Sequence, residues 1–186
     1  MTILLGSKSP RRQELLKGAG IEYSLVEIDC EEDFPDTLPL EQVAEYLAIK
    51  KSMAYRQELQ DSILLTSDTT VLLDNLILNK PQNEEHAKEM LRLMSGKMHK
   101  VYTGVCLRSK EAQIVFTDIT NVYFKEIDEK DIEFYVSHYK PLDKAGAYGI
   151  QDWIGFIGIS RIEGDYFNVM GLPINRVYDS LKQMLQ

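Results

Sequence analysis

Cysteine and histidine are scarce in this chain. Among its 186 residues there are two cysteines and three histidines. Cys30 and Cys106 form no metal-binding or redox spacing, and two lone cysteines in a chain of this size favour a reducing compartment. His86, His99 and His138 show no metal-ligand spacing either. We therefore do not expect a zinc or redox centre. We do expect a cytoplasmic location.

Long apolar runs and an excess of basic residues are also missing. No apolar run is long enough to cross a bilayer, and the apolar start at residues 3–5 is too short for a signal peptide. Lysine and arginine number 21 against 29 acidic residues, a net charge of −8. This balance opposes binding to nucleic acid or to a membrane surface. An anionic substrate would need a local basic pocket.

One motif for a catalytic nucleophile and one motif for nucleotide binding are both absent. There is no Gly-x-Ser-x-Gly segment, so direct attack by water is favoured over covalent catalysis. The small-residue loop at 6–9 lacks the glycine pattern and the Lys-Ser/Thr pair of a P-loop. Any phosphate chemistry must therefore rest on other residues.

Length and patterning predict an α/β protein. The chain suits one domain spanning 1–186, or one domain with two lobes, and its 44% hydrophobic content is that of a soluble globular protein. Apolar runs predict strands at 3–5, 21–28, 63–65, 71–73, 76–78, 100–107, 114–124 and 153–159. Capping signals and periodicity predict helices at 10–17, 40–55, 84–95, 128–136 and 174–185. The last helix is expected to pack through Ile174, Val177, Leu181 and Leu185. Alternating helices and strands with some hairpins indicate a mixed central sheet flanked by helices.

The stretch 63–81 carries an acid and a base near one hairpin. Asp74 and Asn75 tolerate the positive φ of a tight turn, which would pair Val71 with Leu78. The same register would place Lys80 opposite Thr69, beside Asp68. The alternative is an exposed ion pair at a strand end, which contributes little.

The first strand leads into a helix with a basic first turn. Ser9 suits the N-cap, Pro10 suits the first helical position, and Arg11 and Arg12 follow. Basic residues are unfavourable beside the positive end of a helix dipole, so two of them suggest a bound anion. The alternative is a solvated first turn.

One lysine and one acidic loop complete the candidate groups. Lys51 falls on the apolar stripe of the predicted 40–55 helix, so it either reaches to the surface or points into a polar pocket. The acidic residues 29–36, including Glu31 and Glu32, either supply a metal ligand or are simply solvated. Cations together with an acid that can hold Mg²⁺ or activate water suit a nucleotide phosphate site.

Five ordered segments give the chain a family resemblance. They are residues 7–12 (SKSPRR), 67–71 (SDTTV) with 80–81, 95–97 with His99 and 103–105, 143–151 (DKAGAYGIQ), and 164–166 with 171–173. Through them the sequence resembles the Maf family of nucleoside triphosphate pyrophosphatases along essentially its whole length. The resemblance implies a two-lobed fold with a nucleotide cleft, like that of inosine triphosphatases. It also implies hydrolysis of a triphosphate to the monophosphate and pyrophosphate.

The resemblance also assigns substrate and residue roles. The 144–151 loop looks like that of the branch that acts on dTTP and UTP. The family resemblance also implies a divalent metal cofactor, Mg²⁺ or Mn²⁺, and a homodimer. It implies Asp68 as general base and Arg11, Thr69 and Gln151 as selectors of the base, and it matches Arg12, Glu32, Lys51 and Lys80 to further active-site positions. In the mechanism that we expect from these residues, Asp68, Glu32 or both hold the metal ion, and the phosphate ligands are Ser9, Arg11, Arg12, Lys51 and Lys80. Asp152, which follows Gln151 where Gly is common in the family, adds a charge beside a selecting residue. Two alternatives remain, namely the same chemistry on a modified purine nucleotide and a nucleotide-binding cell-division regulator with little catalysis.

Overall fold

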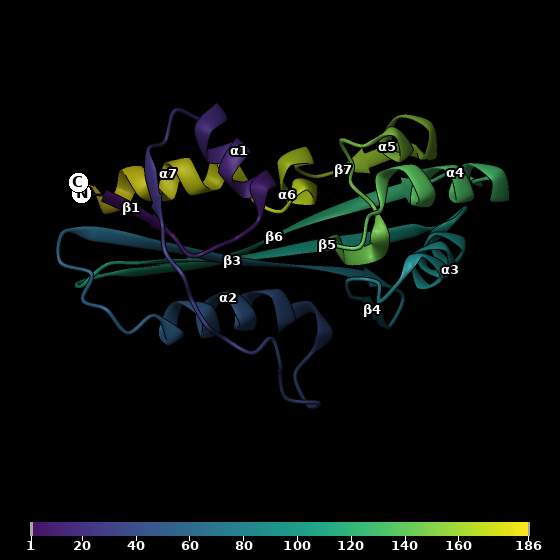
Figure 1. The fold of residues 1–186 in the computed structure, drawn as a ribbon. Helices are drawn as coiled ribbons and strands as arrows, with labels where there is room; N and C mark the ends of the chain where they lie inside the picture. Colours follow the sequence, from purple (N-terminus) through teal and green to yellow (C-terminus); the bar gives the residue numbers. More distant parts are fainter. Residues whose placement is uncertain (1, 186) are drawn as a thin grey trace. The chain divides into compact units, whose positions relative to one another are not determined.

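A computed structural model describes residues 2–185, which form a seven-stranded sheet flanked by helices (Figure 1). The strands are β1 (Thr2–Leu5), β2 (Tyr23–Leu25), β3 (Ser62–Leu73), β4 (Leu76–Leu78), β5 (Met98–Arg108), β6 (Gln113–Phe124) and β7 (Ile159–Glu163). The helices are α1 (Pro10–Gly18), α2 (Val43–Ala54), α3 (Glu84–Met94), α4 (Glu129–Tyr139), α5 (Trp153–Gly158), α6 (Tyr166–Met170) and α7 (Ile174–Met184). Two short 3₁₀ turns, η1 (Leu40–Gln42) and η2 (Ala145–Ala147), precede α2 and α5.

The sheet is mixed, as predicted. Its order is β2-β1-β3-β5-β6-β7, and β4 pairs with β3 off this path. β1 is parallel to both β2 and β3, whereas β4 and β7 are antiparallel to β3 and β6. The predicted α/β class with a central mixed sheet is therefore confirmed.

The contacts divide the chain into two compact units. Unit 1 comprises 1–69, 103–118 and 171–186, and unit 2 comprises 70–102 and 119–170. In unit 1, α1 and α7 lie on one face of the strands and α2 lies on the other (Figure 1). In unit 2, α3, α4 and η2 enclose a core that includes Met90, Met94, Tyr135 and Tyr148.

The β3–β4 hairpin confirms the predicted register. Val71 pairs with Leu78 and Leu73 with Leu76, and Asp74 adopts the positive φ of 53° that the turn requires. β4 ends at Leu78, so the expected continuation to Thr69 and Lys80 is not part of the ladder.

The start of α1 also follows the sequence. Ser9 is the N-cap and Pro10 the first helical residue. Gly20, just past the helix end, has a φ of 69°, which a residue with a side chain rarely adopts.

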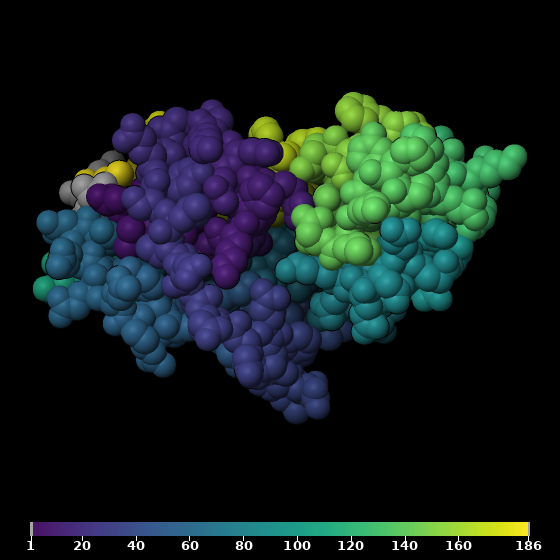
Figure 2. Space-filling model, in the orientation of Figure 1, coloured from purple at the N-terminus to yellow at the C-terminus, as the bar shows by residue number. Residues whose placement is uncertain are grey.

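The segment between β2 and η1 contains the acidic loop. β2 is shorter than the predicted 21–28 strand, and every residue of 26–39 is exposed or half-buried. Figure 2 shows this violet-blue segment running over the surface of unit 1. Its backbone is bound at both ends, where the N–H of Val26 donates to the Leu5 carbonyl and the N–H of Leu38 donates to the Pro35 carbonyl.

One predicted strand is a helix. Residues 153–158 form α5, and only Ile159 of the predicted 153–159 strand lies in β7. The apolar run was ambiguous because a short run of this kind does not separate helix from strand. In the helix, Ile154 is buried while Phe156 is 82% exposed. Leu185 was also wrongly placed in the core of the last helix, since it lies beyond α7 and is 54% exposed.

Candidate active site

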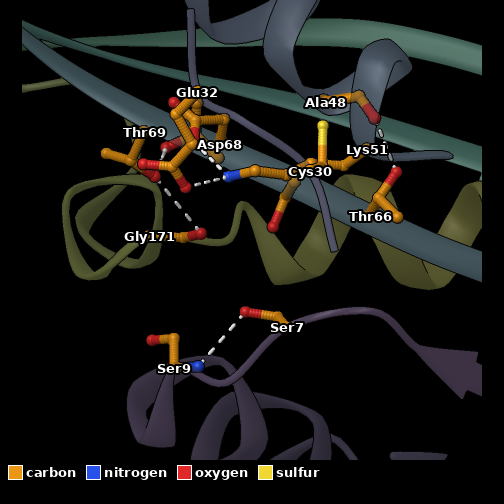
Figure 3. A network of polar contacts seen from close by, with 12 residues as sticks. Ser7, Ser9, Cys30, Glu32, Ala48, Lys51, Thr66, Asp68, Thr69 and Gly171 are labelled. Carbon is orange, nitrogen blue, oxygen red and sulfur yellow. Dashed lines mark hydrogen bonds and ion pairs between the residues drawn. The ribbon is translucent and has the colours of Figure 1, made fainter. Parts of the chain in front are cut away.

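Asp68 and Lys51 form an ion pair in unit 1. Asp68 lies on β3 and Lys51 in the last turn of α2, and the Lys51 Nζ is 2.5 Å from the Asp68 Oδ1 (Figure 3). The two side chains are only 12% and 14% exposed. Lys51 therefore points into a polar pocket rather than to the surface, which resolves the two alternatives that its position on the apolar stripe left open.

The acidic loop brings a second carboxylate to the same ammonium group. The Oε1 of Glu32 lies 2.7 Å from the Lys51 Nζ (Figure 3). The neighbouring pair, Lys50 and Asp33, forms a separate contact on the exposed side of the loop. Glu32 is thus drawn to the site, while Asp33 anchors the loop to α2.

Two tight contacts hold α2 in place behind the ion pair. The hydroxyl of Thr66 on β3 donates to the backbone oxygen of Ala48 at 2.7 Å. On β5, a Cβ added at Gly104 would lie 2.3 Å from the backbone oxygen of Ala44. The helix can approach the sheet this closely only because position 104 has no side chain, and this approach sets the position of Lys51.

Burial dominates the electrostatics of Asp68. Burial raises the pKa of the Asp68 carboxyl, Glu32 adds to the shift, and Lys51 and Arg12 oppose it. A carboxylate with a raised pKa is a stronger base than an ordinary aspartate. Asp68 is therefore suited to accept a proton from water.

Arg12 is bound on all sides by the protein itself. Its Nε donates to the Gly171 carbonyl at 2.8 Å and its Nη1 to the Ser67 carbonyl at 3.0 Å. Its Nη1 also donates to the Ser7 hydroxyl at 3.1 Å, and its Nη2 donates to the Thr69 hydroxyl at 3.1 Å. The guanidinium therefore holds the backbone and side chains on both sides of Asp68, in addition to supplying positive charge.

Thr69 takes part in the same network. Its hydroxyl shares a 2.9 Å hydrogen bond with the hydroxyl of Thr103 on β5. Sequence reasoning assigned no role to Thr103, Ser7 or Gly171, although all three lie in the segments that carry the family resemblance. Their hydrogen bonds join parts of the chain that are distant in sequence, so spacing alone could not reveal them.

The predicted anion site at the start of α1 has the expected backbone. The N–H of Ser9 donates to the Ser7 hydroxyl at 3.2 Å (Figure 3), and the Ser9 hydroxyl does not cap the helix. Arg11 is half-buried in the first turn, which contains no acidic residue. A helix N-terminus with these residues favours an anion.

Lys80 and Gln151 belong to unit 2. Lys80 is exposed and follows β4. The carbonyl of the preceding Asn79 accepts a 3.3 Å hydrogen bond from the N–H of Gly146, in the loop that leads to Gln151. The Oε1 of Gln151 is buried and has no hydrogen-bond partner among the described residues. Such an acceptor is costly unless a donor reaches it.

The donor set near Lys51 fits a magnesium-like ion. Among the described residues, no group of three or more histidine, cysteine or acidic side chains could hold a metal. Asp68 and Glu32 do share one cationic partner, so both carboxylates face one point. Mg²⁺ commonly uses one or two carboxylates together with water and substrate phosphates. The two carboxylates match that requirement.

Comparison with a solved structure defines the fold class. The structure of a HAM1 protein from Coxiella burnetii matches 98% of this chain and 100% of its own, with a TM-score of 0.50 and 13% sequence identity. The two proteins thus share a fold, a mixed sheet flanked by helices. Among the described residues, no helix has the length and apolar character required to cross a membrane.

Sequence comparison identifies the family. Residues 2–184 match the family described as Maf-like protein. The dTTP/UTP pyrophosphatase of Phocaeicola vulgatus is 50% identical over 184 residues, which cover 98% of this chain and 95% of that protein. The dTTP/UTP pyrophosphatase of Bacteroides fragilis (strain ATCC 25285) is 47% identical, with the same coverage. That of Porphyromonas gingivalis (strain W83) is also 47% identical and covers 97% of this chain and 92% of that protein. The chain belongs to the Maf family.

Proposed function

We propose that this protein hydrolyses dTTP and UTP to the nucleoside monophosphate and pyrophosphate with the help of a divalent metal ion. The observation that carries the proposal is the nearly buried Asp68, held by Lys51 beside Glu32. The names of relatives that are 47–50% identical over almost the whole chain support the choice of substrate.

In the proposed reaction, water attacks the α-phosphorus. Asp68 accepts a proton from this water while the water oxygen forms a bond to the α-phosphorus. The bond between the α-phosphorus and the α,β-bridging oxygen breaks, and pyrophosphate leaves. The raised pKa of Asp68 supports its role as the base.

The cations neutralise the charge of the triphosphate. Arg11 and the start of α1 at Ser9 are proposed to bind phosphate oxygens, and Lys51 and Lys80 are proposed to act as further phosphate ligands. Arg12 is proposed to contribute its charge while its nitrogens hold Ser67 and Thr69.

Asp68 and Glu32 would hold the metal ion, Mg²⁺ or Mn²⁺. When bound, such an ion polarises a phosphoryl oxygen and offsets negative charge there. The ammonium of Lys51 contacts the same two carboxylates and lowers the pKa of Asp68, against the effect of burial.

Base selection is assigned to Arg11, Thr69 and Gln151. The amide of Gln151 can meet the donor and acceptor edge of uracil or thymine. The buried, unpartnered Oε1 supports this role, because a base that fails to supply a donor would leave it unsatisfied.

A triphosphate panel with Mg²⁺ and Mn²⁺ tests the proposal. We expect dTTP and UTP to have the highest kcat/KM, with monophosphate and pyrophosphate as products. Asp68→Asn should keep the fold and lose about 100-fold or more in turnover. Undiminished turnover in that variant would refute the mechanism. A preference for purines would reassign the substrate, and tight nucleotide binding without pyrophosphate release would indicate a regulator.

The assembly and location of the protein are further parts of the proposal. We propose a homodimer in the cytoplasm that binds neither nucleic acid nor membranes, as the resemblance and the net charge of −8 suggest. Sedimentation equilibrium gives the mass in solution, and a monomer at working concentration would contradict the dimer.

A further inference from the structure

The loop that carries Gln151 is anchored on one buried phenol. Tyr135 lies on α4 and is fully buried. Its hydroxyl donates to the Oδ2 of Asp152 at 2.8 Å and accepts from the N–H of Gly149 at 3.1 Å. The residues on either side of the 149–152 turn are thus bound to the same oxygen atom, and Gln151 lies between them.

The turn around Gln151 is closed by the backbone as well. The N–H of Asp152 donates to the Gly149 carbonyl at 3.0 Å, and the N–H of Gly155 donates to the Asp152 carbonyl at 2.9 Å. A Cβ at Gly149 would lie 2.6 Å from the Oδ2 of Asp152, so the carboxylate packs directly against the backbone of position 149. Gln151 therefore has little freedom to move along the loop.

The carboxylate of Asp152 does not serve the helix that it precedes. Asp152 is the N-cap of α5, yet its side chain makes no capping hydrogen bond. An aspartate at this position usually accepts from the first turn of its helix. Here it binds Tyr135, and its Oδ2 lies 3.7 Å from the Nζ of Lys144. The charge that the sequence places beside Gln151 is therefore matched by a cation and a donor in its own unit.

We infer that Asp152 is a positioning residue for base selection, acting through Tyr135 and Lys144 to fix the Gln151 loop. The inference rests on the proposed function, because it takes Gln151 as the group that reads the base. An amide whose acceptor is buried and unpartnered can discriminate between bases only if its orientation is held. The hydrogen bonds of Tyr135 supply that restraint from behind the loop.

Tyr135→Phe removes one hydroxyl and is the primary test. The ratio of kcat/KM for dTTP to that for dCTP should fall about tenfold, mainly through a higher KM for dTTP. The kcat for dTTP should change less than about threefold, since the chemistry depends on other residues. Tyr139→Phe is the matched control, because Tyr139 lies on the same helix, stacks on Tyr135 and is 43% exposed. It should keep the wild-type ratio.

Two substitutions of Asp152 separate positioning from simple stability. Asp152→Asn retains an oxygen that accepts from Tyr135 and should keep most of the selectivity, whereas Asp152→Ala should resemble Tyr135→Phe. A role in stability alone would lower kcat/KM for both nucleotides equally. The inference would be overturned if Asp152→Ala kept the wild-type selectivity and the wild-type KM for dTTP. In that case Tyr135→Phe would either keep the wild-type selectivity as well or fail to fold.

Equilibrium binding distinguishes failure of this inference from failure of the proposed function. If the wild-type protein releases no pyrophosphate from any triphosphate, the proposed function fails. Titration with dTTP and dCTP without metal still measures base preference in that case. A loss of preference of about tenfold in Tyr135→Phe and Asp152→Ala supports the inference. An unchanged preference, or none in the wild-type protein, refutes it.

Discussion

At the scale of single residues, the site depends on side chains whose surroundings determine their roles. Lys50 and Lys51 are adjacent, yet Lys50 pairs with Asp33 at the exposed loop while Lys51 binds the nearly buried Asp68. Arg11 and Arg12 are also adjacent. Arg12 donates to Ser67, Thr69 and Gly171, whereas Arg11 is half-buried in the first turn of α1. Identical residue types thus differ because the helix turns them toward different neighbours.

Replacement of Lys51 by Met should affect both rate and pH dependence. Lys51 lowers the pKa of Asp68, against the effect of burial, so its removal raises that pKa further. We expect kcat/KM for dTTP to fall about 100-fold. The acidic limb of the pH–rate profile should move to higher pH. Lys17→Met, at an exposed lysine in the last turn of α1, is the control and should leave both the rate and the profile near wild type. An unshifted limb in Lys51→Met would contradict the ion-pair interpretation.

His99 should make stability depend on pH. It is 1% exposed, and burial lowers its pKa from 6.5 to about 4. Between these values the unfolded chain binds a proton at His99 that the folded chain does not. The contribution to stability is therefore complete above pH 6.5 and is lost as the pH falls toward 4.

Urea unfolding of His99→Gln measures this contribution. The wild-type free energy of unfolding should fall more steeply between pH 6.5 and 4 than that of the variant, by at most about 1.4 kcal/mol per pH unit. His138→Gln, at an exposed histidine, controls for the loss of an imidazole. Parallel curves for the wild type and His99→Gln would show that His99 is not buried as a neutral group.

At the scale of elements, close packing of α2 on the sheet places Lys51 opposite Asp68. The close contact at Gly104 and the hydrogen bond of Thr66 fix the position of α2 along the strands and its distance from them. The helix itself follows from its apolar stripe, in which Val43, Ala44 and Leu47 are buried. The position of Lys51 is thus determined in part by a glycine on β5.

Gly104→Ala should push α2 away from the sheet. The added Cβ would lie within 2.4 Å of backbone atoms of Ala44 and Glu45, which cannot move without the helix. We expect a loss of about 1–3 kcal/mol in the free energy of unfolding, and a loss of activity as Lys51 is displaced. Gly18→Ala is the control, since nothing lies within 4 Å of a Cβ there. Equal stability of both variants would refute the packing argument.

At the scale of the whole molecule, the chain forms two compact units that share three long strands. The division crosses β3, β5 and β6, so each strand contributes to both units. Unit 1 contains the Asp68, Lys51 and Glu32 contacts, and unit 2 contains the anchored Gln151 loop. Residues predicted to act together are thus divided among segments from all parts of the sequence.

Substrate binding should stabilise the folded chain, because the ligand binds the native state and not the unfolded state. A non-hydrolysable dTTP analogue with Mg²⁺, at about 100 times its Kd, should add about 2.7 kcal/mol to the free energy of unfolding. The measurement is thermal unfolding with and without the analogue. The matching dCTP analogue at the same concentration should stabilise less, and equal stabilisation by both would contradict base selection.

Much of the fold was predictable because it rests on local chemistry. The Asp74 turn and the Ser9 and Pro10 start of α1 both formed where the sequence indicated. The 153–159 run was predicted wrongly, since its burial pattern depends on the core against which it packs. The partners of Lys51 could not be predicted from the apolar stripe of its helix either, because they too depend on how the helix packs in the folded chain.

The sequence by itself determined the class of the sheet, the hairpin register and the family, because strand patterns, turn residues and ordered motifs are local features. Only the tertiary structure decided which side chains meet. It joined Lys51 to both Asp68 and Glu32, and it turned the Asp152 carboxylate toward Tyr135. These contacts link residues that are distant in sequence, and their geometry follows from close packing, which no periodicity in the chain encodes.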